Sequence, residues 1–288
     1  MAACLLVLAG RPAGGEVRVV TLPAGTPSHR ATSLAAERRI AVNGSRLLAL
    51  RHVVPATFVG ALDAAYERAQ SRMEDMPSVL LASQLDLQSP EAFDTVVVAP
   101  GGESRPGSAV VFLHGYAGNI GLICWLVARA TLERGLTTYC PSLGFEGDWW
   151  SARGSRTLAA TLRHARRRGA RRVFLVGLSN GAKGASLLAR RYRRQLAGLV
   201  LISGLAGRAA APGIPTLIVH GDRDPAVPAA TARRYVRRAG ARHVVVPGDH
   251  FVLLTREARV RAAITRWITR RLRQAGRSPP ITAQPQPS

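Results

Sequence analysis

The spacing of apolar residues along the chain changes near residue 93. Before it, apolar residues recur at helical spacing between 46 and about 81, while the segment 1–45, rich in glycine, proline and arginine, is expected to be loop except for a strand at 16–22. After it, short apolar runs alternate with amphipathic stretches, and a turn is expected at 101–107. The strands expected there are 95–99, 109–113, 137–140, 173–176, 198–202, 216–220 and 243–246. The helices expected there are 119–134, 155–168, one from about 182 to 194, 229–239 and 256–273.

Alternation of strands and helices indicates the fold class. It implies right-handed crossover connections and an α/β fold in which a mostly parallel sheet carries helices on both faces. Ligands of such sheets bind beyond the carboxyl ends of the strands. We accordingly divide the chain into a poorly ordered segment 1–45, a helical extension 46–90, an α/β domain 91–273 and a proline-containing, disordered tail 274–288.

One apolar run ends in the pentapeptide Gly177-Leu178-Ser179-Asn180-Gly181. Small and apolar residues at helical spacing follow at once, so the pattern predicts a strand, a sharp turn and a helix. A serine on such a turn is held off the end of the strand with its hydroxyl exposed. The two glycines are expected where strand and helix pass too closely for a Cβ atom. A glycine-rich strand–helix turn can also be purely structural, so this motif needs support from the rest of the chain.

Three more polar motifs follow expected strands and supply that support. They are His-Gly-Tyr-Ala-Gly at 114–118, His-Gly-Asp-Arg-Asp-Pro-Ala-Val-Pro at 220–228 and Pro-Gly-Asp-His-Phe at 247–251. With the serine motif, in this order, they resemble the α/β-hydrolase superfamily, particularly its compact, lidless serine esterases of the dienelactone-hydrolase-like and peptidase-like kinds. The resemblance covers about residues 95–273 and implies an α/β-hydrolase fold for that part of the chain. Only 203–215, mostly glycine and alanine, stands where many relatives carry a helical cap, so no large cap insertion is expected.

The resemblance assigns three catalytic roles. Ser179 would be the nucleophile, and it needs an adjacent base because a serine hydroxyl is a poor nucleophile at its free pKa. His250 would be that base, and a carboxylate would orient its imidazole and stabilise the imidazolium. The family pattern places the acid at Asp224. Asp222 is the second choice, and Asp249 could act only if its loop folded back.

The resemblance also implies an oxyanion hole. Backbone N–H groups of Tyr116 and Asn180 would stabilise the negatively charged tetrahedral intermediate. Trp149 and Trp150, which follow another strand end, either line the substrate pocket or fill a surface seam. The remaining histidines are expected to be structural or superficial: bracing loops at 114 and 220, packed or half-exposed at 243, and on the surface at 29, 52 and 164.

Composition narrows the possible partners. The 288 residues carry a net charge of +23, supplied almost entirely by arginine, since Lys183 is the only lysine. The arginines follow the polar faces of expected helices without interleaved aromatic residues, so we expect no specific nucleic-acid binding, although a weak association with anionic surfaces fits the charge. The cysteines at 4, 124 and 140 show no metal or disulfide spacing, and Cys124 and Cys140 are expected to be core thiols.

These features favour one function over its alternatives. We expect a serine hydrolase that cleaves a small carboxylic ester through an acyl-enzyme, without cofactor or metal. A peptidase, a thioesterase or an acyltransferase could use the same triad, and a non-catalytic binding protein could use the same fold. No apolar run is long enough for a transmembrane helix. Unpaired cysteines favour the cytoplasm, whereas the short apolar stretch 2–9 leaves export open, and the oligomeric state is not predicted.

Overall fold

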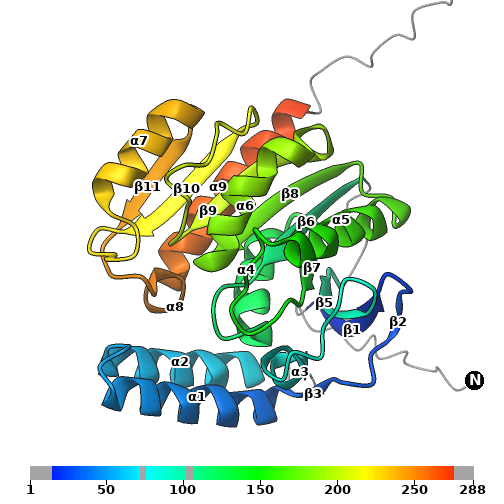
Figure 1. Cartoon of the computed structure of the whole chain (residues 1–288), viewed down its shortest axis with the longest axis vertical. Coiled ribbons are helices and arrows are strands. Elements are labelled where there is room, and N and C mark those ends of the chain that lie inside the picture. The colour runs from blue at the N-terminus through cyan, green and yellow to red at the C-terminus, as the bar shows by residue number, and fades with distance from the viewer. Residues whose placement is uncertain (1–14, 72–75, 102–106, 276–288) are drawn as a thin grey trace, which may run out of the picture.

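A nine-stranded sheet runs through the computed structural model, which describes residues 15–71, 76–101 and 107–275 (Figure 1). The strand order is β11-β10-β9-β8-β6-β7-β5-β1-β2. Strands β6 to β11 pair in parallel, while β5 is antiparallel to β7 and β1 is antiparallel to both β5 and β2. Its strands are β1 (Glu16–Leu22), β2 (Thr26–Pro27), β5 (Phe93–Ala99), β6 (Ser108–Leu113), β7 (Thr137–Pro141), β8 (Arg172–Leu178), β9 (Leu196–Ile202), β10 (Thr216–Gly221) and β11 (Arg242–Val246). The mostly parallel α/β fold expected from the sequence is confirmed.

Helices cover both faces of this sheet, with α4 and α9 on one side and α5, α6 and α7 on the other (Figure 1). Strand β6 shows why its sequence is apolar throughout: Val110 and Phe112 pack into one core layer, and Val111 and Leu113 pack into the other. The helices are α1 (Leu34–Leu50), α2 (Ala56–Gln70), α3 (Leu80–Gln84), α4 (Gly121–Leu132), α5 (Ala152–Arg167), α6 (Asn180–Tyr192), α7 (Ala229–Ala239), α8 (Val252–Thr255) and α9 (Glu257–Ala275). A 3-10 turn at Arg193–Gln195 follows α6, and the small sheet β3 (Thr32–Ser33) and β4 (Pro77–Ser78) lies beside α1.

The expected elements after residue 93 match the structure with shifts of a few residues at their ends, whereas the expected N-terminal elements are partly wrong. The strand at 16–22 is confirmed, but the loop expected after it gives way to α1, which begins at Leu34 with Ser33 as its N-cap. The single helix expected from 46 to about 81 is two helices, separated before Pro55, followed by the short α3. The part of α1 before residue 46 is not predicted by the sequence, because half of the buried residues of α1 are polar, which weakens the apolar periodicity.

Most of the expected turn at 101–107 and of the expected tail at 274–288 lies outside the described residues, apart from the end of α9. The division into four domains stays a prediction. No described helix combines the length and apolarity needed to cross a membrane.

A buried carboxylate fixes the N-terminal helices to the α/β sheet region. Glu37 of α1 is fully buried and accepts hydrogen bonds from the first two backbone N–H groups of α4, at Gly121 (2.8 Å) and Leu122 (3.0 Å). It also accepts from the hydroxyls of Tyr66 (2.9 Å) and Ser78. A negative group at a helix N-terminus satisfies unpaired N–H donors and the helix dipole. Burial raises the Glu37 pKa, and the hydrogen bonds oppose that rise.

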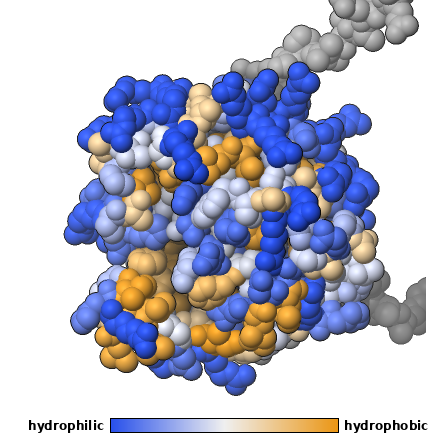
Figure 2. All heavy atoms as spheres, in the orientation of Figure 1, coloured by the Kyte–Doolittle hydropathy of each residue, from blue (hydrophilic) through white to orange (hydrophobic). Residues whose placement is uncertain are grey.

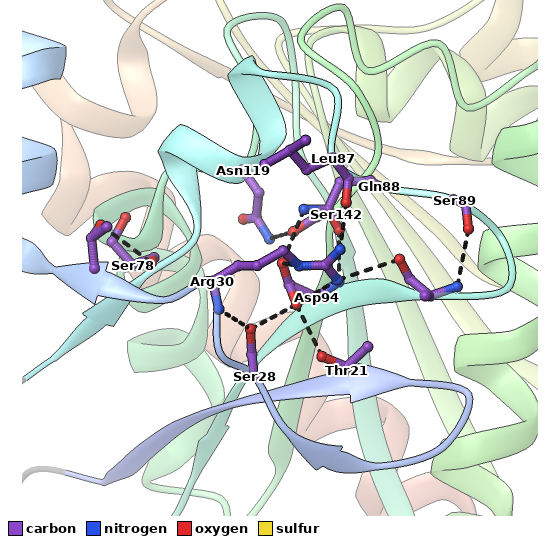
Figure 3. Close-up of polar contacts among 12 residues, drawn as sticks. Thr21, Ser28, Arg30, Ser78, Leu87, Gln88, Ser89, Asp94, Asn119 and Ser142 are labelled. Atoms are coloured by element: carbon purple, nitrogen blue, oxygen red, sulfur yellow. Dashed lines mark hydrogen bonds and ion pairs between the residues drawn. The ribbon is translucent and has the colours of Figure 1, made fainter.

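A second buried carboxylate, Asp94 of β5, binds the N-terminal segment at the edge of the sheet (Figure 3). Its oxygens accept hydrogen bonds from Thr21 (3.2 Å), Ser28 (2.8 Å) and Gln88 (3.0 Å), and Arg30 Nε lies 2.9 Å from Oδ2. A buried charge is tolerated only when it is paired and hydrogen-bonded in this way. Strands β1 and β2 and the residues that follow them as far as Arg30 are therefore fixed to this edge of the sheet.

The cysteine prediction is wrong, because Cys124 of α4 and Cys140 of β7 form a disulfide with their Cα atoms 6.1 Å apart. Both residues are fully buried, as expected. Their proximity arises from the packing of α4 against β7, which a separation of 16 residues in sequence does not reveal. Disulfides persist mainly in oxidising compartments, so the argument from unpaired cysteines for the cytoplasm loses its basis. Cys4 lies outside the described residues.

Candidate active site

Ser179 occupies the strained turn that its motif predicts. It stands between the last residue of β8 and the first residue of α6, with φ 52° and ψ −117°. A Cβ atom on Gly177 would lie 2.5 Å from Gly181 O, and one on Gly181 would lie 2.0 Å from Leu113 O. Side chains are excluded at both positions, so the close approach of strand and helix requires glycine. A non-glycine residue at positive φ is held there only by such surrounding packing.

Three of the predicted site residues lie within hydrogen-bond distance of one another. His250 Nε2 is 2.9 Å from Ser179 Oγ, and His250 Nδ1 is 3.0 Å and 3.1 Å from the two oxygens of Asp224. The Asp224 side chain is fully buried, whereas that of His250 is 21% exposed. A carboxylate opposite Nδ1 favours the tautomer with its proton on Nδ1, which leaves Nε2 free to accept the serine proton.

The two alternative acids do not contact His250. Asp222 accepts a hydrogen bond from Gly248 N (2.8 Å), and Asp249 accepts one from Phe251 N (2.9 Å). Both carboxylates therefore shape the loop that carries His250 rather than touching its imidazole.

The predicted oxyanion donors lie close to Ser179. A Cβ atom on Gly115 would lie 3.1 Å from Ser179 Cβ, so the backbone that leads into Tyr116 passes beside the nucleophile. Asn180 opens α6, where the first N–H groups have no intrahelical acceptor. Within the described residues, neither of these two N–H groups donates to a protein acceptor. The Asn180 side chain points elsewhere and donates to Glu146 O (2.8 Å).

The two tryptophans proposed for the pocket have different environments in the structure. Trp149 is fully buried, donates through Nε1 to His114 O (2.9 Å) and packs against Gly184, so it fills the seam and does not line an open pocket. Trp150 is 37% exposed, and the ammonium of Lys183 lies 4.2 Å from the centre of its ring. A pocket role for Trp150 stays a prediction.

His114 braces the loop beside the nucleophile, as expected. It is buried, its Nδ1 donates to Gly115 O (2.8 Å) and its Nε2 accepts from Leu143 N (3.1 Å). Burial lowers its pKa to about 4, so it stays neutral near pH 7. This arrangement excludes His114 as a proton carrier in the site.

The other histidines lie outside the Ser179 contacts. His220 is buried and stacks on half-buried His243, with ring nitrogens 2.9 Å apart, and burial lowers the pKa of both. His29 and His52 are exposed as expected, whereas His164 is half-buried against Tyr139. Among the described residues, no cluster of three or more histidine, cysteine or acidic side chains could hold a metal ion.

A cavity of about 510 Å³ adjoins Ser179 and His250. The segment between β9 and β10, where a cap would be inserted, contains no helix. Instead the N-terminal helices approach the site, because Phe58 of α2 packs on Phe251, next to His250, with ring centres 4.2 Å apart. The sequence did not show whether residues 46–90 approach the active site. Figure 2 shows apolar side chains gathered over α1, α2 and α3, which carry or adjoin the exposed residues Leu47, Leu50, Val53, Leu81, Leu85 and Leu87.

Comparison with known proteins identifies the fold. No protein-family model matches the chain, and no curated protein matches its sequence. Est1E from Butyrivibrio proteoclasticus superposes with a TM-score of 0.51 at 18% identity, over 63% of this chain and 95% of that one. An α/β serine hydrolase homologue from Coxiella burnetii gives 0.52 at 21% identity, over 62% and 92% of the two chains.

A third structure, a lidless α/β serine hydrolase from Xanthomonas campestris, gives a TM-score of 0.50 at 21% identity. It covers 62% of this chain and 89% of that one. The match covers most of each neighbour, so the matched part of this chain is nearly as long as those whole hydrolase chains. The chain therefore has the α/β-hydrolase fold, and its structural neighbours are serine hydrolases and esterases that include a lidless one.

Proposed function

We propose that this protein is a serine hydrolase that cleaves carboxylic esters through an acyl-enzyme intermediate. The observation that carries the proposal is the continuous hydrogen-bonded chain from Ser179 through His250 to Asp224, with separations of 2.9 Å and 3.0 Å. Nucleophile, base and orienting acid within hydrogen-bond reach form the arrangement that activates a serine.

Each group has one task in the reaction. His250 Nε2 takes the proton of Ser179 as Oγ attacks the ester carbonyl carbon, and Asp224 stabilises the imidazolium that results. The backbone N–H groups of Tyr116 and Asn180 bind the oxyanion of the tetrahedral intermediate. When this intermediate collapses, the ester C–O bond breaks and His250 returns the proton to the departing alkoxide. Water then attacks the acyl-enzyme by the same route and releases the carboxylic acid and free Ser179.

Ester hydrolysis fits better than the other reactions of the same triad. The cavity opens beside Ser179 without an inserted cap, and among the structural neighbours Est1E is an esterase by name that binds ferulic acid, a carboxylic acid. Peptidase, thioesterase and acyltransferase activities use the same three groups, and a screen with peptide, thioester and alcohol acceptor substrates beside the esters compares them. A small-molecule ester is the partner that this cavity volume suits.

The test is covalent labelling by a fluorophosphonate probe, which reacts with activated serines. Wild-type protein should be labelled, and Ser179→Ala and His250→Ala should not, because one removes the nucleophile and the other its base. Ser155→Ala, which changes a serine on α5, is the matched control and should be labelled like wild type. Labelling should be followed by turnover of short-chain 4-nitrophenyl esters. A folded wild-type protein that takes up no probe would instead favour the non-catalytic binding protein.

A further inference from the structure

The charged side chains that line the cavity beside Ser179 are cationic. Within the described part of the chain, the lining of this cavity includes Lys183 and Arg208 and contains no aspartate or glutamate. Asp224 is fully buried and hydrogen-bonded to His250, so its carboxylate is not open to a ligand. The N-terminus of α6, a helix of 13 residues, also meets this cavity at Asn180 and adds positive potential. The electrostatic field in the cavity therefore favours a negatively charged group.

Lys183 is fixed at this place by the fold. Its backbone N–H donates to Ser179 O (2.9 Å), so its side chain leaves the first turn of α6. Lys183 lines the cavity, and its ammonium lies over the Trp150 ring, 4.2 Å from the ring centre, which restricts this flexible side chain. Among the described residues no carboxylate lies within ion-pair distance of it. In a chain whose other cations are arginines, the single lysine stands one helical turn after the nucleophile.

Arg208 reaches the same cavity from the segment between β9 and β10. Two hydrogen bonds hold the segment around it: Ala206 N donates to Ser186 Oγ (3.0 Å), and Arg238 donates to Gly207 O (2.8 Å). The Arg208 side chain is exposed, and no ion pair ties it to another described residue. It thus presents a second cation without a partner to whatever enters the cavity.

Ser203 adds an independent sign that the cavity receives a polar ligand group. It lines the cavity at a backbone φ of 46°, and its side chain is fully buried. Its Oγ has no hydrogen-bond partner within the described structure. Buried hydroxyls are normally paired, so an unpaired one beside a cavity suggests that a ligand or a water completes its bonding.

We propose that this cavity binds a free carboxylate of the substrate, so that the enzyme acts on esters that carry a second, ionised carboxyl group. The inference rests on the proposed ester hydrolysis at Ser179. Lys183 and Arg208 are specificity-determining residues that hold the carboxylate by charge-assisted hydrogen bonds, while the ester carbonyl meets Ser179. Hydrolysis of such a substrate consumes one water and releases an alcohol and a carboxylic acid, which together carry one more ionised carboxyl group than the ester had.

The test compares matched esters with and without the charge. The ratio of kcat/KM for mono-(4-nitrophenyl) glutarate to that for 4-nitrophenyl pentanoate measures preference for a charge on the acyl side. The same ratio for 3-carboxyphenyl and phenyl pentanoate measures preference on the alcohol side. We expect one of the two ratios to exceed about 10 in wild type and to fall about fivefold or more in Lys183→Gln and in Arg208→Gln. Arg190→Gln, an exposed arginine further along α6, is the matched control and should keep the wild-type ratio.

Two further readouts separate this inference from the proposed function. Raising NaCl from 20 to 500 mM should lower the preferred ratio, because salt screens exposed charges. Glutarate binding to Ser179→Ala, measured by calorimetry, should weaken when Lys183→Gln is added. Two results would overturn the carboxylate site and leave the esterase intact. One is turnover of neutral esters with both ratios near 1, and the other is ratios that stay at the wild-type value in Lys183→Gln and in Arg208→Gln. Glutarate binding that depends on Lys183, in a protein that turns over no ester, would keep the site and overturn the esterase.

Discussion

At the scale of single residues, aspartates that are close in sequence have different roles because they have different hydrogen-bond partners. Asp222 and Asp224 lie two residues apart in one turn, yet only Asp224 reaches His250 Nδ1, while Asp222 accepts from Gly248 N. Asp224→Asn should lower kcat about 10³- to 10⁴-fold, because an amide favours the wrong tautomer of the imidazole. Asp222→Asn keeps an oxygen for Gly248 N and should lower kcat less than about tenfold. Steady-state kinetics on a 4-nitrophenyl ester measures both, and a larger loss in Asp222→Asn would reassign the acid.

The catalytic residues could be predicted from the sequence because they lie in motifs whose order along the chain is typical of serine hydrolases. The order serine, acid, histidine pointed to Ser179, Asp224 and His250, and these three meet in the structure. The proposed role of Lys183 could not be predicted from the sequence, since it depends on how the segment between β9 and β10, with Arg208, folds against the start of α6. Contacts between segments far apart in sequence leave no local pattern.

At the scale of elements, the N-terminus of α4 depends on a carboxylate from a different helix. Burial raises the Glu37 pKa above 4.5, so the folded state holds this proton to higher pH than the unfolded state does. Stability from Glu37 is therefore greatest below about pH 4.5 and declines by about 1.4 kcal/mol for each pH unit between the unfolded-state pKa and the raised folded-state pKa. Urea unfolding at several pH values should show that, as the pH rises above about 4.5, the free energy of unfolding of wild type falls relative to that of Glu37→Gln. Glu91→Gln, at an exposed loop carboxylate, is the control and should show no such trend.

Glu37→Gln should also be less stable than wild type near pH 4, by about 1–3 kcal/mol, because the amide places N–H donors opposite donors. An unchanged or higher free energy of unfolding there would mean that the cap at α4 contributes little. The sequence could not predict this cap, since a glutamate in a helix is normally exposed and the two N–H groups that it caps on α4 lie more than 80 residues away.

The link between α4 and β7 gives a second prediction for elements. Thiol titration of the denatured, unreduced protein should find one free cysteine of the three in the sequence, because Cys124 and Cys140 are paired. Closing a loop of this size restricts the unfolded chain, so reduction should lower the free energy of unfolding by about 3 kcal/mol. Three titratable thiols in protein purified without reductant would contradict the disulfide.

At the scale of the whole molecule, the α/β region could be predicted from the sequence, whereas in the N-terminal region the strand at 16–22 could be and the helices were predicted only in part. The runs after residue 93 are buried on both faces or amphipathic, so their periodicity is strong. In contrast, α1 buries only two apolar residues and is held by polar contacts. Such contacts leave no periodic pattern of apolar residues in the sequence. The segment 15–71 joins the rest through β1 on the sheet, Glu37 on α4 and Phe58 on Phe251.

These three attachments predict that the N-terminal helices unfold together with the hydrolase fold instead of as a separate extension. All four tryptophans lie at or after residue 125, so their fluorescence reports only the α/β region, whereas far-ultraviolet circular dichroism also reports α1 and α2. Urea transitions followed by the two signals should coincide if the protein unfolds as one cooperative unit. Phe58→Ala, which removes the aromatic contact beside His250, should shift both transitions to lower urea by the same amount. A helical signal that is lost before the fluorescence changes would show that the N-terminal helices unfold as a separate unit.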